Sequence, residues 1–503
     1  MPLGSLWDCK YLKKIYFMQQ FCKKIHYSSY LRVKSDRDMI TFLVCLALLV
    51  TAYFTYGRYL ERQAGADASA EMPCRRLYDG VDYVPLPRWR AFLIQLLNIA
   101  GTGPIFGAVL GACFGPVAFL WITFGGIFMG AMHDYLSGMM LVRNDGLSIP
   151  EVVGRYLGEG MRHFMRIFSV LLLVLVGAVF LLSPAQLLAN MVPAISCPVW
   201  VWLILAYYFV ATLLPIDKII GRIYPLFGVA LVAMALGLLG AVIVGDYRIP
   251  ELTTLHNFQL DPARVPIVPT LFITIACGAI SGFHATQSPL MARCVGNERA
   301  CRSVFYGAMI SESIIALIWA AVAMAFFGGA GELSAALGEH GGSAAWAVDT
   351  ISNGMLGVVA APITSGDTAF RSARLIIADM LHLEQRSKLK RFYICIPLFA
   401  VGYWITQVDF DVVWRYFAWT NQTLATIVLW AIVVFLQRRR SNRWVGLLPA
   451  LFMTFVCSSF LFVSDQFLGM ENRTVAYACG VAVTVAVTAG MLLKLKHDAK
   501  SNS

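Results

Sequence analysis

The stretch Asn98-Ile-Ala-Gly-Thr-Gly-Pro104 lies in the middle of the apolar run 92–112. A second interrupted run, Gly278-Ala-Ile-Ser-Gly-Phe-His-Ala-Thr-Gln-Ser-Pro289, lies within 266–290. Glycine and proline inside an apolar run break a helix at membrane depth. The freed backbone groups then need a polar cavity or a ligand, because leaving them unpaired in hydrocarbon is costly. Each break is therefore a candidate binding site, although either one alone is also explained by a simple kink.

The composition of the chain requires a bilayer as its solvent. The chain has 503 residues, of which 58% are hydrophobic and 14% charged, and its mean hydropathy is +0.68. Because a helix needs about 20 apolar residues to cross a membrane, charge-poor windows predict thirteen spans. These spans are 39–57, 92–112, 116–140, 165–183, 198–215, 221–245, 266–290, 304–328, 345–369, 392–408, 411–436, 444–464 and 474–493. Their length excludes the short alternating segments of a barrel, so we predict an all-α polytopic membrane protein.

Lys and Arg residues follow this division into spans. Every second loop is basic: seven loops or ends hold 28 Lys and Arg residues, and the alternate loops hold three. Positive residues mark the cytoplasmic side, so we expect a multi-pass protein of the bacterial inner membrane with a cytoplasmic C-terminus. The net charge of +11 is accounted for in this way and does not indicate a nucleic-acid partner.

The first 38 residues are an exception to this pattern, because they carry eight basic residues on the side predicted to be outside. Long tails can cross a membrane regardless of charge. We favour a different interpretation, in which the biological start is Met39 and residues 1–38 are a basic extension that is not native.

The two breaks lie five spans apart, and an odd number of spans inverts the second copy of a repeat. The predicted divisions are a leading helix and cytoplasmic approach loop (39–91), a first five-helix repeat (92–245), an extracytoplasmic loop (246–265), a second five-helix repeat (266–436), and two accessory helices with a tail (437–503). This plan resembles the LeuT-type five-plus-five fold of the amino-acid/polyamine/cation transporters, with one extra N-terminal and two extra C-terminal helices.

Polar residues gather at both breaks. We predict that each second half-helix begins at a proline, Pro104 or Pro289, because that position needs no N–H group. The positive end of such a half-helix favours a carboxylate, which suits a small carboxylic acid or a peptide C-terminus. The candidate solute-binding residues are Asn98, Gly101, Thr102, Gly103, Ser281, Gly282, His284, Thr286, Gln287, Ser288 and Asn421. For any single Ser or Thr, hydrogen bonding between helices is the competing interpretation.

Ionisable residues inside the spans are candidates for ion coupling. His133 and Asp134 lie within 116–140, and an ionisable pair at that depth suits proton coupling. A structural hydrogen bond to a neighbouring helix explains them equally well. Glu312, within 304–328, has a similar status.

The stretch Pro362-Ile-Thr-Ser-Gly-Asp-Thr-Ala-Phe-Arg371 ends the eighth core helix. By resemblance to the LeuT-type fold, Thr364 and Ser365 would hold a sodium ion through their oxygens. Asp367 would add charge or carry a proton, or else pair with Arg371 as a latch at the cytoplasmic mouth.

The sequence leaves the role of two neighbouring amides open, and it gives no sign of a metal site or a disulfide framework. Asn421 and its neighbour Gln422 reach the solute or only tie helices together. No cysteine spacing or histidine cluster indicates a structural metal, and no disulfide framework is apparent. We therefore expect no cofactor besides a coupling ion, H⁺ or Na⁺.

Six stretches together resemble the carbon starvation protein A (CstA) family, over residues 39–495. They are Leu77-Tyr-Asp-Gly-Val-Asp-Tyr-Val-Pro85, Asn98-Ile-Ala-Gly-Thr-Gly-Pro104, Gly130-Ala-Met-His-Asp-Tyr-Leu-Ser-Gly138, Arg143-Asn-Asp-Gly146, Pro362-Ile-Thr-Ser-Gly-Asp-Thr-Ala-Phe-Arg-Ser-Ala-Arg374 and Trp419-Thr-Asn-Gln-Thr423. The resemblance implies uptake of short peptides or pyruvate, proton-coupled for pyruvate, in response to carbon or nutrient starvation. Long members of the family have a larger C-terminal part than this compact chain.

These observations predict a secondary transporter whose partners are a small solute and the lipid bilayer, in an oligomeric state that the sequence does not indicate. A channel and a nutrient-sensing receptor are the alternatives. The His, Asp and Glu residues are too scattered in the sequence to suggest a catalytic centre, so we do not expect an enzyme.

Overall fold

The computed structural model describes residues 39–80, 82–213, 216–245, 247–352, 356–381, 383, 388–408 and 410–501. Within these ranges the chain is helical, apart from loops and one isolated β-bridge between Leu86 and Val295. The predicted basic extension, 1–38, lies outside the described residues.

The first half of the chain contains α2 (Ile40–Phe54), α3 (Tyr56–Ala64), α4 (Pro73–Arg76), α5 (Arg88–Ile99), the π-helical η1 (Gly103–Gly107), α6 (Ala108–Ala112), α7 (Val117–Leu120), the π-helical η2 (Trp121–Ala131), α8 (Met132–Val142), α9 (Ile149–Leu157), α10 (Glu159–Met191), α11 (Cys197–Leu213) and α12 (Ile216–Val244). The second half contains α13 (Ile267–Thr274), α14 (Gly282–Ala292), the π-helical η3 (Arg302–Tyr306), α15 (Gly307–Phe327), α16 (Ala330–Glu339), α17 (Ala344–Ser352), α18 (Leu356–Met380), α19 (Lys388–Ile405), α20 (Phe410–Arg438), α21 (Trp444–Val463) and α22 (Arg473–Ser501).

Each of the thirteen predicted spans coincides with one or more helices, but they differ in apolar length. In the described part of the chain, eight helices are long and apolar enough to cross a membrane alone, and the bent pair α5 and η1–α6 would make nine. The other four predicted spans correspond to α11, the pair α13 and α14, the pair α17 and α18, and α19. These four are not among the helices that are long and apolar enough to cross a membrane alone. The count of thirteen spans therefore stays a prediction.

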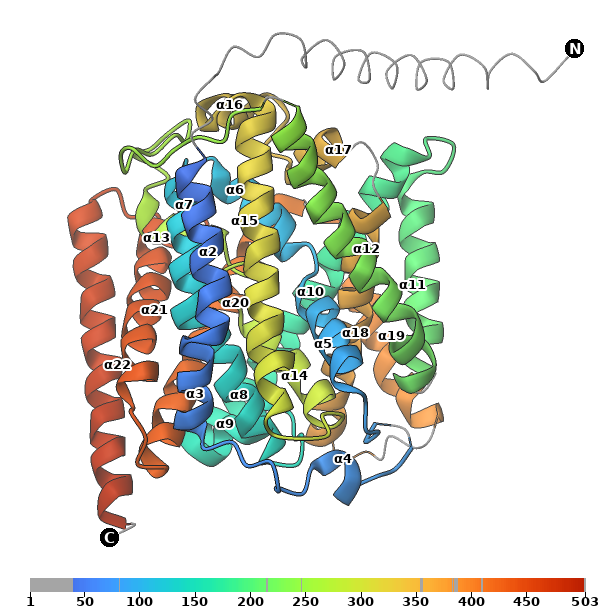
Figure 1. Ribbon diagram of the computed structural model, residues 1–503, viewed down its shortest axis with the longest axis vertical. Coiled ribbons are helices and arrows are strands. Elements are labelled where there is room, and N and C mark those ends of the chain that lie inside the picture. Colours follow the sequence, from blue (N-terminus) through green and yellow to red (C-terminus); the bar gives the residue numbers. More distant parts are fainter. Residues whose placement is uncertain are drawn as a thin grey trace, which may run out of the picture.

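The helices surround a packed interior in which α10 lies against α18 and α20, while α14 lies against α5 and α8. In Figure 1, α22 lies at one edge of the bundle and α11 at the opposite edge. The exposed faces of the outer helices are apolar, as at Val485 and Leu493 of α22 and Trp202 of α11. These faces suit contact with lipid.

Contacts between loops follow the predicted alternation. Arg143, after α8, donates hydrogen bonds of 2.8 Å to the carbonyl oxygens of Ala64 and Gly65 and pairs with Glu298 at 2.8 Å. These three predicted cytoplasmic loops therefore meet at one end of the bundle, the end where α4, α9 and the C-terminus lie (Figure 1). At the opposite end, where α16 lies, Arg264 pairs with Asp465. Which end faces the cytoplasm stays a prediction.

Both predicted breaks are present. At the first break, α5 ends at Ile99 and the chain turns by 59° before η1 begins at Gly103. At the second break, residues 275–281 separate α13 from α14. The first proline assignment is right to within one residue, since η1 begins at Gly103 and Pro104 is its second residue.

The second proline assignment is wrong. The half-helix α14 begins at Gly282, after Ser281 in an extended conformation, and Pro289 lies inside it. Asn421 explains this earlier start, because its side-chain oxygen accepts a hydrogen bond of 2.7 Å from the backbone N–H group of Phe283. An amide from another helix thus satisfies one of the free N–H groups at the helix start, which a sequence pattern does not reveal.

Candidate functional site: a buried polar cluster where the two broken helices meet

The two breaks are in direct contact. A Cβ atom added at Gly103 would lie 2.3 Å from Cβ and Sγ of Cys277, which belongs to the unwound stretch of the second break. Gly101 is packed in the same way, because its Cβ atom would lie 2.6 Å from the ring of Phe180 and 3.1 Å from Cβ of Ser365. Glycine at 101 and 103 therefore permits the close approach of the first broken helix to its neighbours.

Polar side chains at the first break are buried and keep donor and acceptor atoms without hydrogen-bond partners in the described structure. Asn98, in the last turn of α5, is fully buried, and neither atom of its amide group has a hydrogen-bond partner in the structure. The hydroxyl group of Thr102 is also buried without a partner. Unmet capacity of this kind is costly unless a ligand or water satisfies it.

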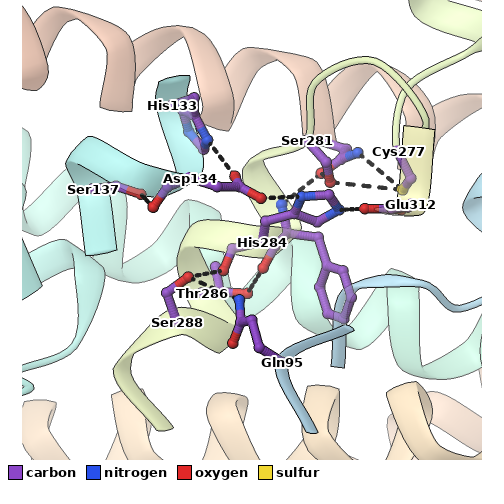
Figure 2. A network of polar contacts seen from close by, with 12 residues as sticks. Gln95, His133, Asp134, Ser137, Cys277, Ser281, His284, Thr286, Ser288 and Glu312 are labelled. Carbon is purple, nitrogen blue, oxygen red and sulfur yellow. Dashed lines mark hydrogen bonds and ion pairs between the residues drawn. The ribbon is translucent and has the colours of Figure 1, made fainter. Parts of the chain in front are cut away.

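A chain of ionisable side chains lies at the second break (Figure 2). Nδ1 of His133 lies 2.8 Å from one carboxylate oxygen of Asp134, and Nδ1 of His284 lies 2.8 Å from the other. On its far side, Nε2 of His284 lies 3.3 Å from the carboxylate of Glu312. All four side chains are completely buried. The fold thus joins α8, α14 and α15 through one chain of proton-carrying groups.

Burial gives this cluster its chemical character. Two carboxylates in a dry interior need protons or positive charge nearby, because isolated charges there are strongly disfavoured. His284 lies between both carboxylates and can hold a proton next to either one (Figure 2). Apart from the 3.3 Å ion pair with His284, neither oxygen of Glu312 has a hydrogen-bond partner among the described residues. The arrangement is therefore suited to binding and releasing a cation.

Asn421 of α20 connects the cluster to the rest of the second break. Its side-chain oxygen accepts hydrogen bonds from Ser281 Oγ at 3.1 Å and from the Phe283 N–H group. Gly282 permits this approach, since a Cβ atom there would lie 2.5 Å from backbone atoms of α20. Gln422, next in sequence, donates to the carbonyl oxygen of Phe272 at 3.1 Å. Both amides therefore tie helices together, as one of the two interpretations of the sequence expected.

The polar residues on α14 form a second line of contacts. Thr286 donates to the carbonyl oxygen of Phe283 at 2.6 Å, and Ser288 to that of His284 at 2.9 Å. Gln95 of α5 approaches Ser288 at 3.4 Å, and Ser372 of α18 donates to Gln287 at 3.3 Å. These bonds link α14 to α5 and α18, and they reach the ionisable chain only at the backbone of His284.

The candidate sodium residues lie beside the first break. Ser365 donates a hydrogen bond of 2.7 Å to the carbonyl oxygen of Leu97, one turn before the bend. Thr364 donates within its own helix, to the carbonyl oxygen of Ala361 at 2.8 Å. The Ser365 hydroxyl group and the Leu97 carbonyl thus place two oxygens together, although whether a cation binds them stays a prediction.

Asp367 is fully buried, and its carboxylate lies 4.0 Å from the guanidinium group of Arg371 one turn later in α18. This contact agrees with the interpretation in which Asp367 pairs with Arg371 as a latch. Asp367 belongs to a different helix from the chain of ionisable residues at the second break.

A cavity of about 510 Å³ opens at the end of the bundle where α16 lies. Its walls include Cys113 after α6, Thr274 at the end of α13, and Trp414 and Arg415 of α20. The cavity is therefore lined in part by the C-terminal end of the first broken helix and by α13 of the second.

The sequence missed one member of the cluster. Cys277 is not among the predicted site residues, yet its Sγ atom lies 3.6 Å from Ser281 Oγ and 3.8 Å from the Asn421 amide nitrogen. Its position in the interrupted run 266–290 was the only available signal. Glu312, noted in the sequence, joins the cluster through a contact with His284 across 28 residues of chain.

Two broken helices in contact, surrounded by apolar-faced helices, define the class of the protein: a multi-pass membrane protein with a LeuT-type arrangement. Solved structures agree with this class. An Eremococcus coleocola manganese transporter aligns with a TM-score of 0.53 at 14% identity, covering 85% of this chain and 99% of that chain. MhsT in complex with L-phenylalanine aligns with a TM-score of 0.50 at 14% identity, covering 78% and 97%. At this identity the similarity concerns the fold alone.

The chain belongs to the family described as carbon starvation protein CstA, whose profile matches residues 37–199 and 184–362. A Haemophilus influenzae membrane protein is 42% identical over 340 residues, which is 58% of this chain and 91% of that protein. The Escherichia coli peptide transporter CstA is 25% identical over 546 residues, 81% of this chain and 78% of the relative. The Escherichia coli pyruvate/proton symporter BtsT is 25% identical over 336 residues, 54% of this chain and 47% of the relative. The predicted family is confirmed, and its named relatives support a transporter.

Proposed function

We propose that this protein is a secondary active transporter that imports a small carboxylate-bearing nutrient, a short peptide or pyruvate, with the inward movement of protons. One observation carries the proposal: the first break contacts the second through Gly103 and Cys277, and Sγ of Cys277 lies within 4.8 Å of a ring nitrogen of His284 and a carboxylate oxygen of Glu312 in the buried Asp134–His284–Glu312 chain. The names of the relatives CstA and BtsT support the two solute classes.

The solute site in this proposal lies at the first break. Asn98 and Thr102 supply amide and hydroxyl groups that the protein leaves unpaired. The N–H groups at the start of η1 add the positive end of a half-helix. A carboxylate there would satisfy donors that are otherwise costly to bury, which favours a small acid over an uncharged solute.

Proton coupling in this proposal uses the second break. Protonation neutralises one carboxylate and weakens its attraction to His284, so the ion pairs that join α14 to α8 and α15 loosen. Because the two breaks are in contact, loosening of the ion pairs at the second break changes the packing at the first. The proposed transport cycle is alternating access of a five-plus-five inverted repeat around these contacts, with the cavity beside Arg415 as the outer approach.

The test is uptake of labelled pyruvate and of a labelled dipeptide into proteoliposomes, under an imposed proton gradient and then an imposed sodium gradient. Accumulation of either solute that depends on the proton gradient is the expected result. Saturable binding without accumulation would replace the proposal with a receptor. Flux without saturation or counterflow would replace it with a channel.

A further inference from the structure

The residues Cys277, His284 and Glu312 form a second functional arrangement within the buried cluster. Sγ of Cys277, a ring nitrogen of His284 and a carboxylate oxygen of Glu312 all lie within 4.8 Å of one another. Each of the three side chains is at most 1% exposed. A thiol, an imidazole and a carboxylate are the three ligand types that zinc and related transition metals accept. From this geometry we infer that the cluster binds a divalent transition-metal ion of the zinc type.

Hydrogen bonding within the cluster supports the inference. Nε2 of His284 and both oxygens of Glu312 are buried, and their mutual ion pair at 3.3 Å lacks the geometry of a hydrogen bond. Buried polar atoms that converge without hydrogen bonds mark a place where a ligand satisfies them. A metal ion would satisfy the Nε2 atom and the carboxylate together.

The surroundings of His284 match those of a metal-bound histidine. A ligating histidine commonly directs its other ring nitrogen to a carboxylate, which fixes the ring orientation and raises the basicity of the ligand. Nδ1 of His284 lies 2.8 Å from Asp134, whose other oxygen lies 2.8 Å from His133 (Figure 2). Asp134 would thus position the ligand without contacting the metal.

Charge and distance are compatible with this ion. With Cys277 bound as a thiolate, Asp134, Glu312 and Cys277 would carry three negative charges into a dry interior. One divalent cation offsets two of these charges, and a proton on His133, whose Nδ1 lies 2.8 Å from Asp134, offsets the third. Tetrahedral zinc places its ligand atoms about 3.5 Å apart, so the three side chains would move together by about 1 Å. Cys277 lies in the non-helical stretch of the second break, so its movement toward the other two ligands would break no helical hydrogen bond of α13 or α14.

This site was not apparent from the sequence, which led us to expect no structural metal. His284 follows Cys277 by seven positions, and Glu312 follows His284 by 28. Metal motifs are recognised by short fixed spacings. Here a helix break and a neighbouring helix bring the ligands together instead.

The test is binding of Co²⁺ and of Zn²⁺ to tag-free, full-length protein in detergent or nanodiscs. Co²⁺ reports a thiolate ligand through a charge-transfer absorption band, and bound Zn²⁺ is counted by elemental analysis. We expect one ion per chain, with affinity that falls as pH falls because the ligands must lose protons. Cys277→Ser should abolish the charge-transfer band. Glu312→Gln should weaken binding at least tenfold, and Asp134→Asn by about 10–100-fold.

The matched control is Cys457→Ser, since Cys457 is a buried cysteine of α21 that contacts Thr426 outside the cluster. It should leave the band and the stoichiometry unchanged. Melting temperature and monodispersity of each variant separate loss of binding from loss of folding. No saturable binding to the folded wild-type protein, or a band that survives in Cys277→Ser, would overturn the inference. The inference shares His284 and Glu312 with the proposed proton chain, but metal binding is measured without transport, so its failure is distinguishable from a failure of the proposed function.

Discussion

The two broken helices differ in what they leave unsatisfied. The first break carries neutral polar groups, Asn98 and Thr102, without partners in the protein. The second break carries groups tied to the rest of the molecule, through Asn421 and through the contacts of His284 with Asp134 and Glu312. Unpaired neutral donors suit a solute that comes and goes, whereas linked ionisable groups suit a cation that changes how helices are held. The difference suggests a division of labour, with solute at the first break and coupling at the second.

The largest effect should come from Glu312→Gln. This change removes a titratable group from the second break but keeps its size, so proton-driven accumulation should be lost while solute counterflow continues. The measurement is uptake in proteoliposomes with and without a proton gradient. Asp145→Asn is the control, because Asp145 lies in a loop with positive φ, a conformation that asparagine tolerates. Full accumulation by the Glu312 variant would remove this residue from coupling.

Asn98→Leu should separate solute binding from stability. Leucine has a similar volume and relieves a buried amide without partners, which should raise the stability of the protein by about 1–3 kcal/mol. The KM for the solute should nevertheless rise at least tenfold.

Melting temperature and uptake kinetics check this prediction. Asn144→Leu provides the contrast, because the Asn144 amide donates to the carbonyl oxygen of Met140 at 2.7 Å and its loss should lower the melting temperature. An unchanged KM in Asn98→Leu would mean that the first break does not contact solute.

Gly103→Ala tests the contact between the breaks. Its Cβ atom would lie 2.3 Å from Cys277, and overpacking of this kind costs about 1–3 kcal/mol. We expect a lower melting temperature and impaired transport. Gly237→Ala, which would meet no atom within 4 Å, should be neutral or slightly stabilising. Equal stability of the two variants would show that the breaks do not touch as described.

The smallest effect should come from Thr364→Ala combined with Ser365→Ala. Loss of the 2.7 Å hydrogen bond from Ser365 to Leu97 should cost about 1 kcal/mol of stability. Any stimulation of uptake by an imposed sodium gradient should disappear in the double variant. Wild-type uptake that is identical with and without sodium would end the assignment of these residues to sodium.

The sequence predicted the features that depend on residues close together in the chain. The presence of a break in each of the runs 92–112 and 266–290 was predictable because glycine, proline and polar residues interrupt long apolar runs. His133, Asp134 and Glu312 were identifiable because ionisable residues are rare at membrane depth. The basic loops were predictable from their charge alone, and the loops that share a predicted side do meet through Arg143.

Contacts between distant segments were not predictable. Nothing in the sequence places Cys277 against Gly103, or Glu312 against His284, because these contacts depend on how separate helices pack. The start of α14 was misjudged for the same reason: a local rule pointed to Pro289, while an amide from α20 holds the helix start seven residues earlier. A hydrogen-bond partner from another helix therefore outweighed the preference of proline for the first turn of a helix.

The most direct test of the account is the proton movement that accompanies solute. Wild-type protein and the Asp134→Asn variant are reconstituted with a pH indicator inside the liposomes, and pyruvate or a dipeptide is added outside. The account predicts acidification of the interior on addition of solute in the wild-type protein and none in the variant, although both exchange labelled solute. Solute accumulation without proton movement, or identical acidification in the variant, would contradict the claim that the buried cluster couples protons to transport.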